Sequence, residues 1–176
     1  MSTVKTLTSI FAAILSLAGV GSAGAAETKI KPPVNLDKPV TNPRLVVAIH
    51  NHQRHQTNES AVELFSELKR SNFLVAIVLE KAPEQTGEGQ ARFKKGDIIK
   101  VVQLRDANDK SLLALFTDHE QLQKWTHDAN STLVMPTKQA FNFVIEKGYD
   151  GLVINPADGA SLRLEATFIQ KALKDI

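Results

Sequence analysis

The stretch from residue 113 to residue 156 constrains the fold most, because short apolar runs alternate there with helix-like segments. Three apolar runs predict buried strands, at 112–116, 133–135 and 152–154. Between the first two runs, Leu122 and Trp125 give a short helix an apolar face. Between the last two, apolar residues recur with the helical period over 140–145. The stretch therefore predicts strand, helix, strand, helix and strand in succession.

Polar and glycine residues mark the ends of these elements. Thr117 with Glu120 three residues later predicts a capping box, in which two helix-start amides are satisfied. Pro136 ends the middle strand, and Thr137 is placed to cap the next helix. Gly148 suits the left-handed position that ends a helix.

Several segments of the chain carry a resemblance to a known family. They are Asn42-Pro43 with Leu45 and Ala48, Phe65 and Leu68 before 73–75, 114–118 with Trp125, 134–136 and 148–156. In this order and spacing the chain resembles the SseB N-terminal domain family, named for the enhanced serine sensitivity protein, over roughly residues 42–174. The resemblance implies a small mixed α/β domain and no established catalytic residues.

The remaining segments complete a single domain over 44–176. Residues 44–52 have strand propensity, but the resemblance implies a helix there, and Leu45, Ala48, Ile49 and His52 share one helical face, so a helix is predicted. A second helix starts with Asn58 as its cap and carries an apolar stripe of Ala61, Leu64, Phe65 and Leu68.

Strands are predicted at 73–79 and 98–104, and these form an antiparallel meander with 112–116. A turn is expected at 107–110, an edge strand at 161–164, and a closing helix at 166–174 that buries Phe168, Ile169, Ala172 and Leu173. The predicted fold class is α/β (α+β), with a mixed, mostly antiparallel sheet of five to six strands flanked by helices.

Residues 1–26 have the pattern of a secretory signal peptide. Lys5 supplies the positive charge, 7–20 is apolar, and Ala23-Gly24-Ala25 matches a cleavage site. The alternative is an uncleaved amino-terminal anchor. Residues 27–43 read as a proline-rich linker. Cleavage predicts a periplasmic or secreted protein without a stable membrane anchor.

Composition narrows the possible chemistry. The chain has no cysteine, which excludes disulfides, thiol catalysis and cysteine-based zinc sites. Lys and Arg total 21 against 19 Asp and Glu, so no nucleic-acid partner is expected. Gly87 and Gly89 do not form a dinucleotide fingerprint, and no phosphate loop or nucleophile elbow occurs. No cofactor is predicted.

Three histidines within six residues, His50, His52 and His55, are candidate metal ligands, because imidazole binds zinc, copper and nickel. The alternative is the polar end of a helix. A metal-dependent hydrolase would need these histidines to meet distant carboxylates, or His119 and His127, in a deep pocket.

Other polar residues allow two interpretations. Asp118, His119 and Glu120 fit a helix start, where acidic groups are favoured, and the alternative is a catalytic role. Asp150 and Asp158 either form turns or pair as carboxylates across the last hairpin.

Candidate partner contacts are few. Tyr149 is a candidate surface aromatic, and Arg92, Lys94 and Lys95 make a loop locally basic, with a solvated loop as the alternative.

Two functions remain. The favoured one is a non-enzymatic exported module that binds another protein, which predicts a contiguous exposed apolar or aromatic patch. The alternative is a small metal-dependent hydrolase or metal-binding protein that uses the histidine cluster.

Overall fold

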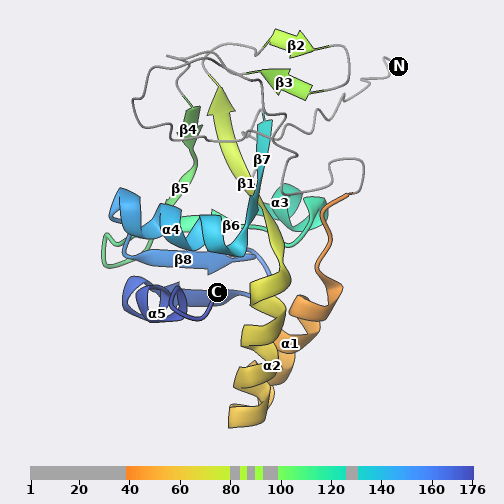
Figure 1. Ribbon diagram of the computed structural model, residues 1–176, viewed down its shortest axis with the longest axis vertical. Coiled ribbons are helices and arrows are strands. Elements are labelled where there is room, and N and C mark those ends of the chain that lie inside the picture. Colours follow the sequence, from red (N-terminus) through yellow and green to blue (C-terminus); the bar gives the residue numbers. More distant parts are fainter. Residues whose placement is uncertain (1–38, 80–83, 87–89, 93–98, 126–130) are drawn as a thin grey trace, which may run out of the picture.

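The computed structural model describes residues 39–79, 84–86, 90–92, 99–125 and 131–176 (Figure 1). The helices within these residues are α1 (Pro43–His55), α2 (Asn58–Arg70), α3 (His119–Trp125), α4 (Thr137–Lys147) and α5 (Ala166–Ala172). The strands are β1 (Asn72–Leu79), β2 (Glu84–Thr86), β3 (Gln90–Arg92), β4 (Ile99–Val101), β5 (Gln103–Arg105), β6 (Ser111–Leu115), β7 (Ser131–Pro136), β8 (Gly151–Ile154) and β9 (Leu162–Glu165). The signal-peptide prediction lies outside the described residues.

The helix predicted over 44–52 is confirmed, although the same residues have strand propensity. Pro43 stands in the first helical turn, where its missing N–H costs nothing. Leu45, Ala48 and Ile49 are buried on one face, and Gln56 ends α1 in the left-handed conformation. Tertiary burial of that face outweighs the local preference for a strand.

Thr57, rather than the predicted Asn58, caps α2. The Thr57 hydroxyl accepts a hydrogen bond from the Ser60 amide at 3.2 Å, and the Ser60 hydroxyl oxygen accepts one from the Thr57 amide at 3.1 Å. This reciprocal arrangement is a capping box built with serine in place of glutamate. Asn58 is therefore the first helical residue.

The strands form two main sheets rather than the predicted single sheet. The first has the order β4-β1-β7, and both neighbours are antiparallel to β1. The second has the order β5-β6-β8-β9, in which only β6 and β8 are parallel. A small ladder joins β2 and β3. The α+β class and the mostly antiparallel pairing are confirmed.

The sheets separate at Val102, inside the strand predicted at 98–104. β4 pairs with β1 before Val102, and β5 pairs with β6 after it. The Val102 amide donates to the Ala76 carbonyl at 2.9 Å, and an isolated bridge links Leu74 to Phe116. The predicted meander therefore exists, but it bends from one sheet into the other.

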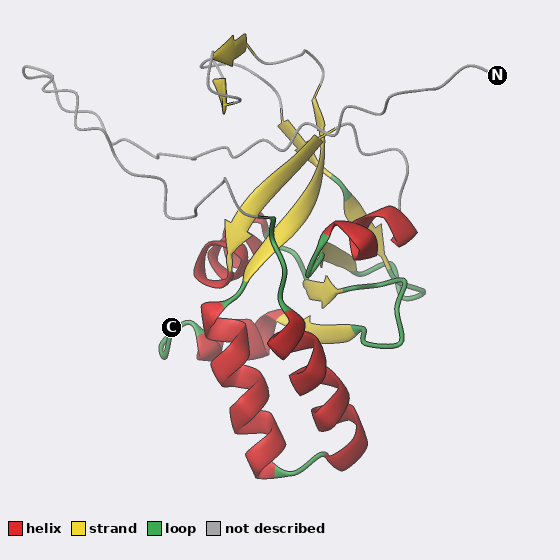
Figure 2. Ribbon diagram, turned by 90° about the vertical axis from the view of Figure 1, so that its right-hand side faces the viewer, coloured by secondary structure: helices red, strands yellow, loops and turns green. Residues whose placement is uncertain are grey.

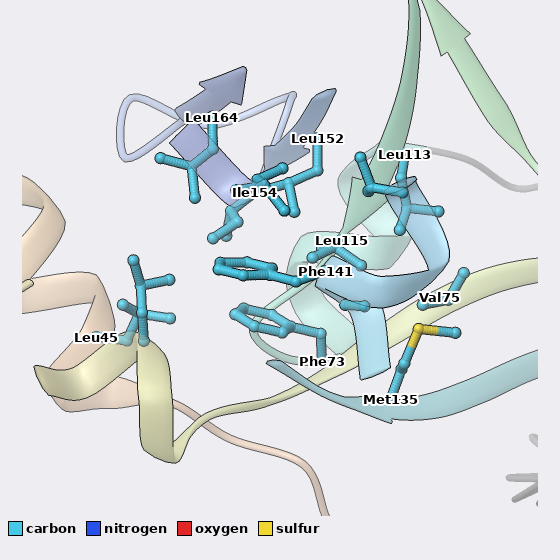
Figure 3. Packing of buried hydrophobic residues seen from close by; sticks show 14 of the residues in the cluster. Leu45, Phe73, Val75, Leu113, Leu115, Met135, Phe141, Leu152, Ile154 and Leu164 are labelled. Carbon is cyan, nitrogen blue, oxygen red and sulfur yellow. The ribbon is translucent and has the colours of Figure 1, made fainter. Parts of the chain in front are cut away.

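β1 carries side chains to a core on each of its faces. Phe73, Val75 and Ile77 enter the main core, shown around Phe73 and Phe141 in Figure 3. Leu74 and Ala76 enter a second core. The main core also holds Leu45, Leu113, Leu115, Met135, Leu152, Ile154 and Leu164, and the second holds Ala114, Phe116, Leu122 and Val134, with Trp125 against it. An uninterrupted apolar strand covered on both sides was predicted here, and it is confirmed.

The chain crosses from β6 to its parallel neighbour β8 through α3, β7 and α4. Gly148 ends α4 at φ 68°, as predicted. Pro136, not Thr137, occupies the cap position at the start of α4. The buried Thr137 hydroxyl instead lies within hydrogen-bond distance of the carbonyl oxygens of Leu68 and Ser71. It thereby fastens α4 to the junction of α2 and β1.

α1 and α2 form a hairpin that projects from the sheets, as Figures 1 and 2 both show. At the other end of the chain, β9 is the predicted edge strand and α5 covers the sheet. Ile169 and Ala172 of α5 are buried, but Phe168 is 44% exposed. The prediction that Phe168 faces the core is wrong, because its ring packs against Phe65 at the surface.

Candidate functional site

A buried polar network lies where the parallel strands β6 and β8 end. The Thr117 amide donates to Asn155 Oδ1 at 3.0 Å, and Asn155 Nδ2 donates to the Thr117 hydroxyl oxygen at 3.0 Å. Both residues are fully buried, and Asn155 adopts a left-handed conformation with φ 50°. The carboxyl ends of parallel strands are a common place for ligand sites, so this network is the first candidate.

Asp118 continues the network into α3. Its Oδ2 accepts a hydrogen bond from the Thr117 hydroxyl at 2.9 Å, and its Oδ1 accepts one from the Gln121 amide at 2.9 Å. Asp118 therefore caps α3, and the predicted box of Thr117 and Glu120 is wrong. Glu120 instead forms a 2.9 Å ion pair with Lys124, and this hydrogen bond raises the pKa of Lys124.

Asp150 and Asp158 have separate structural roles. Asp150 Oδ2 accepts from the Ser111 amide at 2.8 Å, just before β8 begins. Asp158 lies beyond the other end of β8, where its Oδ2 accepts from Gln121 Nε2 at 2.5 Å and its Oδ1 from the Gly159 amide. The turn interpretation is confirmed, and the alternative in which the two carboxylates pair is wrong.

Asn42 ties this network to the start of α1. Its Nδ2 lies 2.8 Å from the carbonyl oxygens of both Asn72 and Thr117. One amide thus holds the first helix, the start of β1 and the end of β6 together. The sequence marks Asn42 only as part of the family resemblance, since a contact over 75 residues leaves no local pattern.

The network joins separate elements of the fold, and its buried Thr117 and Asn155 side chains are not accessible to a substrate. Its hydroxyl and carboxylate pair, Thr117 and Asp118, could resemble an activated nucleophile, but Thr117 is 0% exposed. Among its described neighbours, His119 Nε2 and Gln121 Oε1 are buried without a hydrogen-bond partner. These residues are two apart on α3 and point to different sides of the helix, so they do not converge on one ligand.

The predicted metal ligands lie on the second half of α1. His52 Nδ1 is 3.0 Å from the Ser60 hydroxyl oxygen, which links α1 to α2. In the described ranges, no group of three or more His, Asp or Glu side chains could hold a metal ion. His119 lies on α3, and His127 is outside the described residues. The metal site stays a prediction, and the geometry of the described residues gives it no support.

Of the residues predicted to contact a partner, the structure describes the side chain of Tyr149 but not those of the three basic residues. Tyr149 is only 8% exposed and packs at 5.9 Å between ring centroids against Phe143, so the prediction of a surface aromatic is wrong. Arg92 ends β3, where its side chain is not described, and Lys94 and Lys95 lie outside the described residues. The contacts proposed for these basic residues stay predictions.

A charged cluster crosses the outer side of the second sheet. Arg163 on β9 contacts Asp106 at 2.7 Å and Glu165 at 2.8 Å. The hydrogen bond from Arg163 holds the pKa of Asp106 below its usual value, with help from the Lys110 amide. Because Asp106 begins the turn between β5 and β6, the cluster joins that turn to the edge strand. Its charges are satisfied internally.

An apolar surface lies across α2 and α5, where Val62 and Phe168 are exposed and Phe65 is half-buried against the main core. We call Val62, Phe65, Lys69 and Phe168 the α2–α5 patch. Val62 is 70% exposed and stands one helical turn before Phe65. The Phe65 and Phe168 rings meet edge to face with centroids 6.5 Å apart, and Lys69 Nζ lies 5.2 Å from the Phe65 centroid. Two of the three large apolar side chains exposed in the described structure belong to this patch.

One residue of this patch is unusual in the sequence pattern of α2. Val62 falls outside the predicted apolar stripe of α2, and valine has a lower helix propensity than its neighbours Ala61 and Glu63. A shallow hollow lies along the same outer side of α2. It is lined by Asn58, Glu59, Val62, Glu63, Ser66 and Glu67.

The described structure contains no helix with the length and apolar character that a bilayer crossing needs. Its two bent sheets, crossover helices and projecting hairpin define a small α+β protein.

A comparison with known protein families identifies the family to which this α+β protein belongs. The family described as the SseB protein N-terminal domain matches residues 45–171, and the chain belongs to it. This confirms the resemblance seen in the sequence. No curated protein and no solved structure matches the chain.

Proposed function

We propose that this chain is an exported, non-enzymatic module of the SseB N-terminal domain family that binds another protein. The α2–α5 patch carries the proposal. Apolar groups exposed together at a surface favour association, because a partner removes them from water. Burying one valine fully contributes about 1.5 kcal/mol or more, and aromatic anchors such as Phe168 contribute further.

The patch is also well ordered for binding. The Phe65 ring contacts Phe168 and also Lys69, whose Nζ donates to the Asp175 carbonyl at 3.0 Å. Side chains that are already fixed lose little conformational entropy when a partner arrives. Glu59 and Glu63 border the patch and favour partners with basic groups beside an apolar anchor.

The alternative, a metal-dependent hydrolase, requires ligands and a carboxylate that converge in a pocket. The described histidines do not offer this arrangement, so binding is the better-supported function. The site of action rests on the sequence alone. Residues 1–26 have the charge, apolar run and small residues of a signal peptide, so we place the mature protein in the periplasm or outside the cell.

A capture experiment tests the proposal. The tagged full chain is expressed, recovered from the periplasmic fraction and incubated with native periplasmic extract, with and without a chelator. Captured proteins are identified by mass spectrometry, and the intact mass of the bait reports cleavage near Ala25. Val62→Asp is compared with Val47→Asp, since Val47 is a 55% exposed valine on α1, outside the patch.

The proposal predicts a specific partner that survives the chelator, is lost with Val62→Asp and is kept with Val47→Asp. A partner lost only on chelation would favour the histidine cluster instead. Capture that is equal for both variants, or absent altogether, would contradict binding through this patch. Absence of the protein from the periplasmic fraction would contradict export.

A further inference from the structure

The chain contains two Asp-Gly sequences, Asp150-Gly151 and Asp158-Gly159. In such a sequence the glycine amide nitrogen is unhindered, because glycine has no Cβ, and it can attack the carboxyl carbon of the aspartate. We propose that Asp158-Gly159 is a site of covalent modification, at which Asp158 converts through a cyclic imide to isoaspartate, and that the fold protects Asp150-Gly151 from the same reaction. This inference is independent of the proposed function.

The reaction needs only the protein and water. The Gly159 nitrogen bonds to the carbon of the protonated Asp158 carboxyl group. The carboxyl hydroxyl and the amide proton leave together as water, and the ring closes as a succinimide. Water then adds to one of the two ring carbonyls. Opening at the side-chain carbonyl restores aspartate, whereas opening at the main-chain carbonyl leaves the chain running through the former side chain, as isoaspartate.

The geometry at Asp158 favours ring closure. The Gly159 amide nitrogen lies 2.7 Å from Asp158 Oδ1. The carboxyl carbon is one C–O bond, about 1.2 Å, from that oxygen, so the attacking nitrogen and the carbon that it attacks are already close. Asp158 Oδ2 accepts a hydrogen bond at 2.5 Å from Nε2 of Gln121, which is buried on α3. This contact keeps the carboxyl group beside the nitrogen, and such proximity accelerates a reaction.

The turn leaves room for the ring. Gly159 is exposed, and nothing lies within 4 Å of the position of an added Cβ. Among the described residues, no main-chain carbonyl accepts a hydrogen bond from the Gly159 amide. The Asp158 amide donates to the Asn155 carbonyl at 3.1 Å, and the Ser161 amide donates to the Asp158 carbonyl at 3.1 Å. Ring closure therefore disturbs the hydrogen bond at the Asp158 carbonyl but no strand pairing.

Asp150-Gly151 has the same sequence but is built into the second sheet. Gly151 is buried, and it pairs with β6 on one side and with β9 on the other. The Asp150 carbonyl accepts from the Ala166 amide at 2.9 Å, and Asp150 Oδ2 accepts from the Ser111 amide at 2.8 Å. Ring closure here requires the peptide group to turn, which would break the pairing of β8 with both neighbours. Asp150 should therefore be unreactive in the folded protein.

Conversion of Asp158 to isoaspartate should loosen the connection between β8 and β9. The main chain gains an atom, and the displaced carboxylate no longer meets Gln121 in the same geometry. Gln121 Oε1 is already buried without a partner, so the loss of the contact at Nε2 would leave the whole amide group unsatisfied, which is costly. The turn also contacts α1, because Gln53 Nε2 donates to the Ser161 carbonyl at 2.9 Å. We therefore expect the modified protein to unfold at a lower temperature.

Ageing of the purified protein, prepared by expression of the full chain, tests the inference. The protein is kept in mildly acidic buffer, which favours the protonated carboxyl group that loses water. Trypsin then releases one peptide, between Lys147 and Arg163, that contains both Asp-Gly sequences. Electron-transfer fragmentation distinguishes isoaspartate from aspartate at each position, and an unaged sample corrects for isoaspartate formed during digestion. A sample aged in urea reports the reactivity of the two sequences without the fold.

We expect isoaspartate to form severalfold faster at Asp158 than at Asp150 in the folded protein, and at similar rates at both positions in urea. Gly159→Ala should slow the reaction at Asp158 severalfold, because its methyl group hinders the nitrogen, and circular dichroism should show an unchanged fold. The aged protein should have a lower midpoint of thermal unfolding than the unaged protein.

Three results would overturn the inference. The first is equal rates at Asp158 and Asp150 in the folded protein. The second is a preference for Asp158 that persists unchanged in urea, since the fold would then not select the site. The third is no isoaspartate at Asp158 in the folded protein under conditions in which the unfolded chain reacts.

Discussion

Asn155 is the residue on which the buried polar network depends. Its amide satisfies the Thr117 amide and hydroxyl, and these have no solvent to replace it. Its left-handed backbone, with φ 50°, is one that asparagine tolerates better than most residues. Asn155 thus adopts the left-handed backbone conformation after β8 and also supplies the hydrogen-bond partners of Thr117 after β6.

Replacing Asn155 by alanine should be strongly destabilising. The Thr117 amide would be buried without a partner, and alanine would be strained at positive φ, so we expect a loss of about 3 kcal/mol in the free energy of unfolding. Urea denaturation measures the loss. The control is Asn108→Ala, an exposed turn residue, which should change stability by about 0.5 kcal/mol or less. Similar values for the two variants would contradict the role of Asn155.

Tyr149 gives a prediction about pH. Burial raises the pKa of its phenol, although a hydrogen bond with Gln103 lowers it in part. The neutral phenol therefore contributes stability that is complete below the unfolded pKa of about 10 and is lost as pH rises through the folded pKa. Because the chain has one tyrosine, phenolate absorbance reports this group alone. We expect a midpoint above that of the urea-unfolded protein, and equal midpoints would show that the ring is solvated.

Residue-level predictions from sequence succeeded where the physics was local. Gly148 ends α4 in the left-handed conformation because glycine alone adopts it without strain, which requires no knowledge of the fold. The role of Asn42, in contrast, depends on two carbonyl oxygens that tertiary structure brings together. Tyr149 was misplaced for the same reason, since its neighbours are set by packing.

At the scale of elements, the connection from α4 to β8 uses two glycines for different purposes. Gly148 has a positive φ of 68°, and nothing lies within 4 Å of the position of an added Cβ. Gly151 instead allows close strand contact, because an added Cβ would lie 2.3 Å from the Leu164 carbonyl oxygen. Gly148 is therefore needed for its left-handed backbone conformation, and Gly151 is needed for the close pairing of β8 with β9.

Alanine substitutions should separate these two purposes. Gly148→Ala should cost about 1 kcal/mol through backbone strain alone. Gly151→Ala should cost about 3 kcal/mol or more, because backbone atoms of β9 must move. Gly159→Ala, with open space and no positive φ, is the control and should be nearly neutral. Thermal and urea unfolding of all three give the comparison, and a larger cost at Gly148 than at Gly151 would contradict the close-contact explanation.

Element types were largely predictable because apolar periodicity and burial agree along most of the chain. The existence of α2 and α4 and of β1, β6, β7 and β8 follows from such patterns, whereas the prediction of α1 also depended on the family resemblance. The division of 98–104 into β4 and β5 does not follow from such patterns, since Val102 is as compatible with a continuous strand as with a bend. The chain bends at Val102 because β4 pairs with β1 before this residue and β5 pairs with β6 after it.

For the whole molecule, the two sheets lie side by side, and the α1–α2 hairpin projects from them (Figures 1 and 2). The polar residues that could suggest chemistry are used to fasten this structure, as Thr117, Asp118 and Asn155 show. The apolar residues left over lie on the hairpin and on α5. Sequence could anticipate that a binding module would expose such a patch, but not its location, since Phe168 is placed by its contact with Phe65.

Photo-crosslinking in living cells tests the central claim, binding through the α2–α5 patch, most directly. A photoreactive amino acid is placed at Val62, at Phe168, or at Val47 as the exposed control. The account predicts adducts from the first two positions and not from Val47, and an adduct of twice the chain's mass would identify a second copy. Crosslinks from Val47 alone, or from none of the three positions, would contradict it.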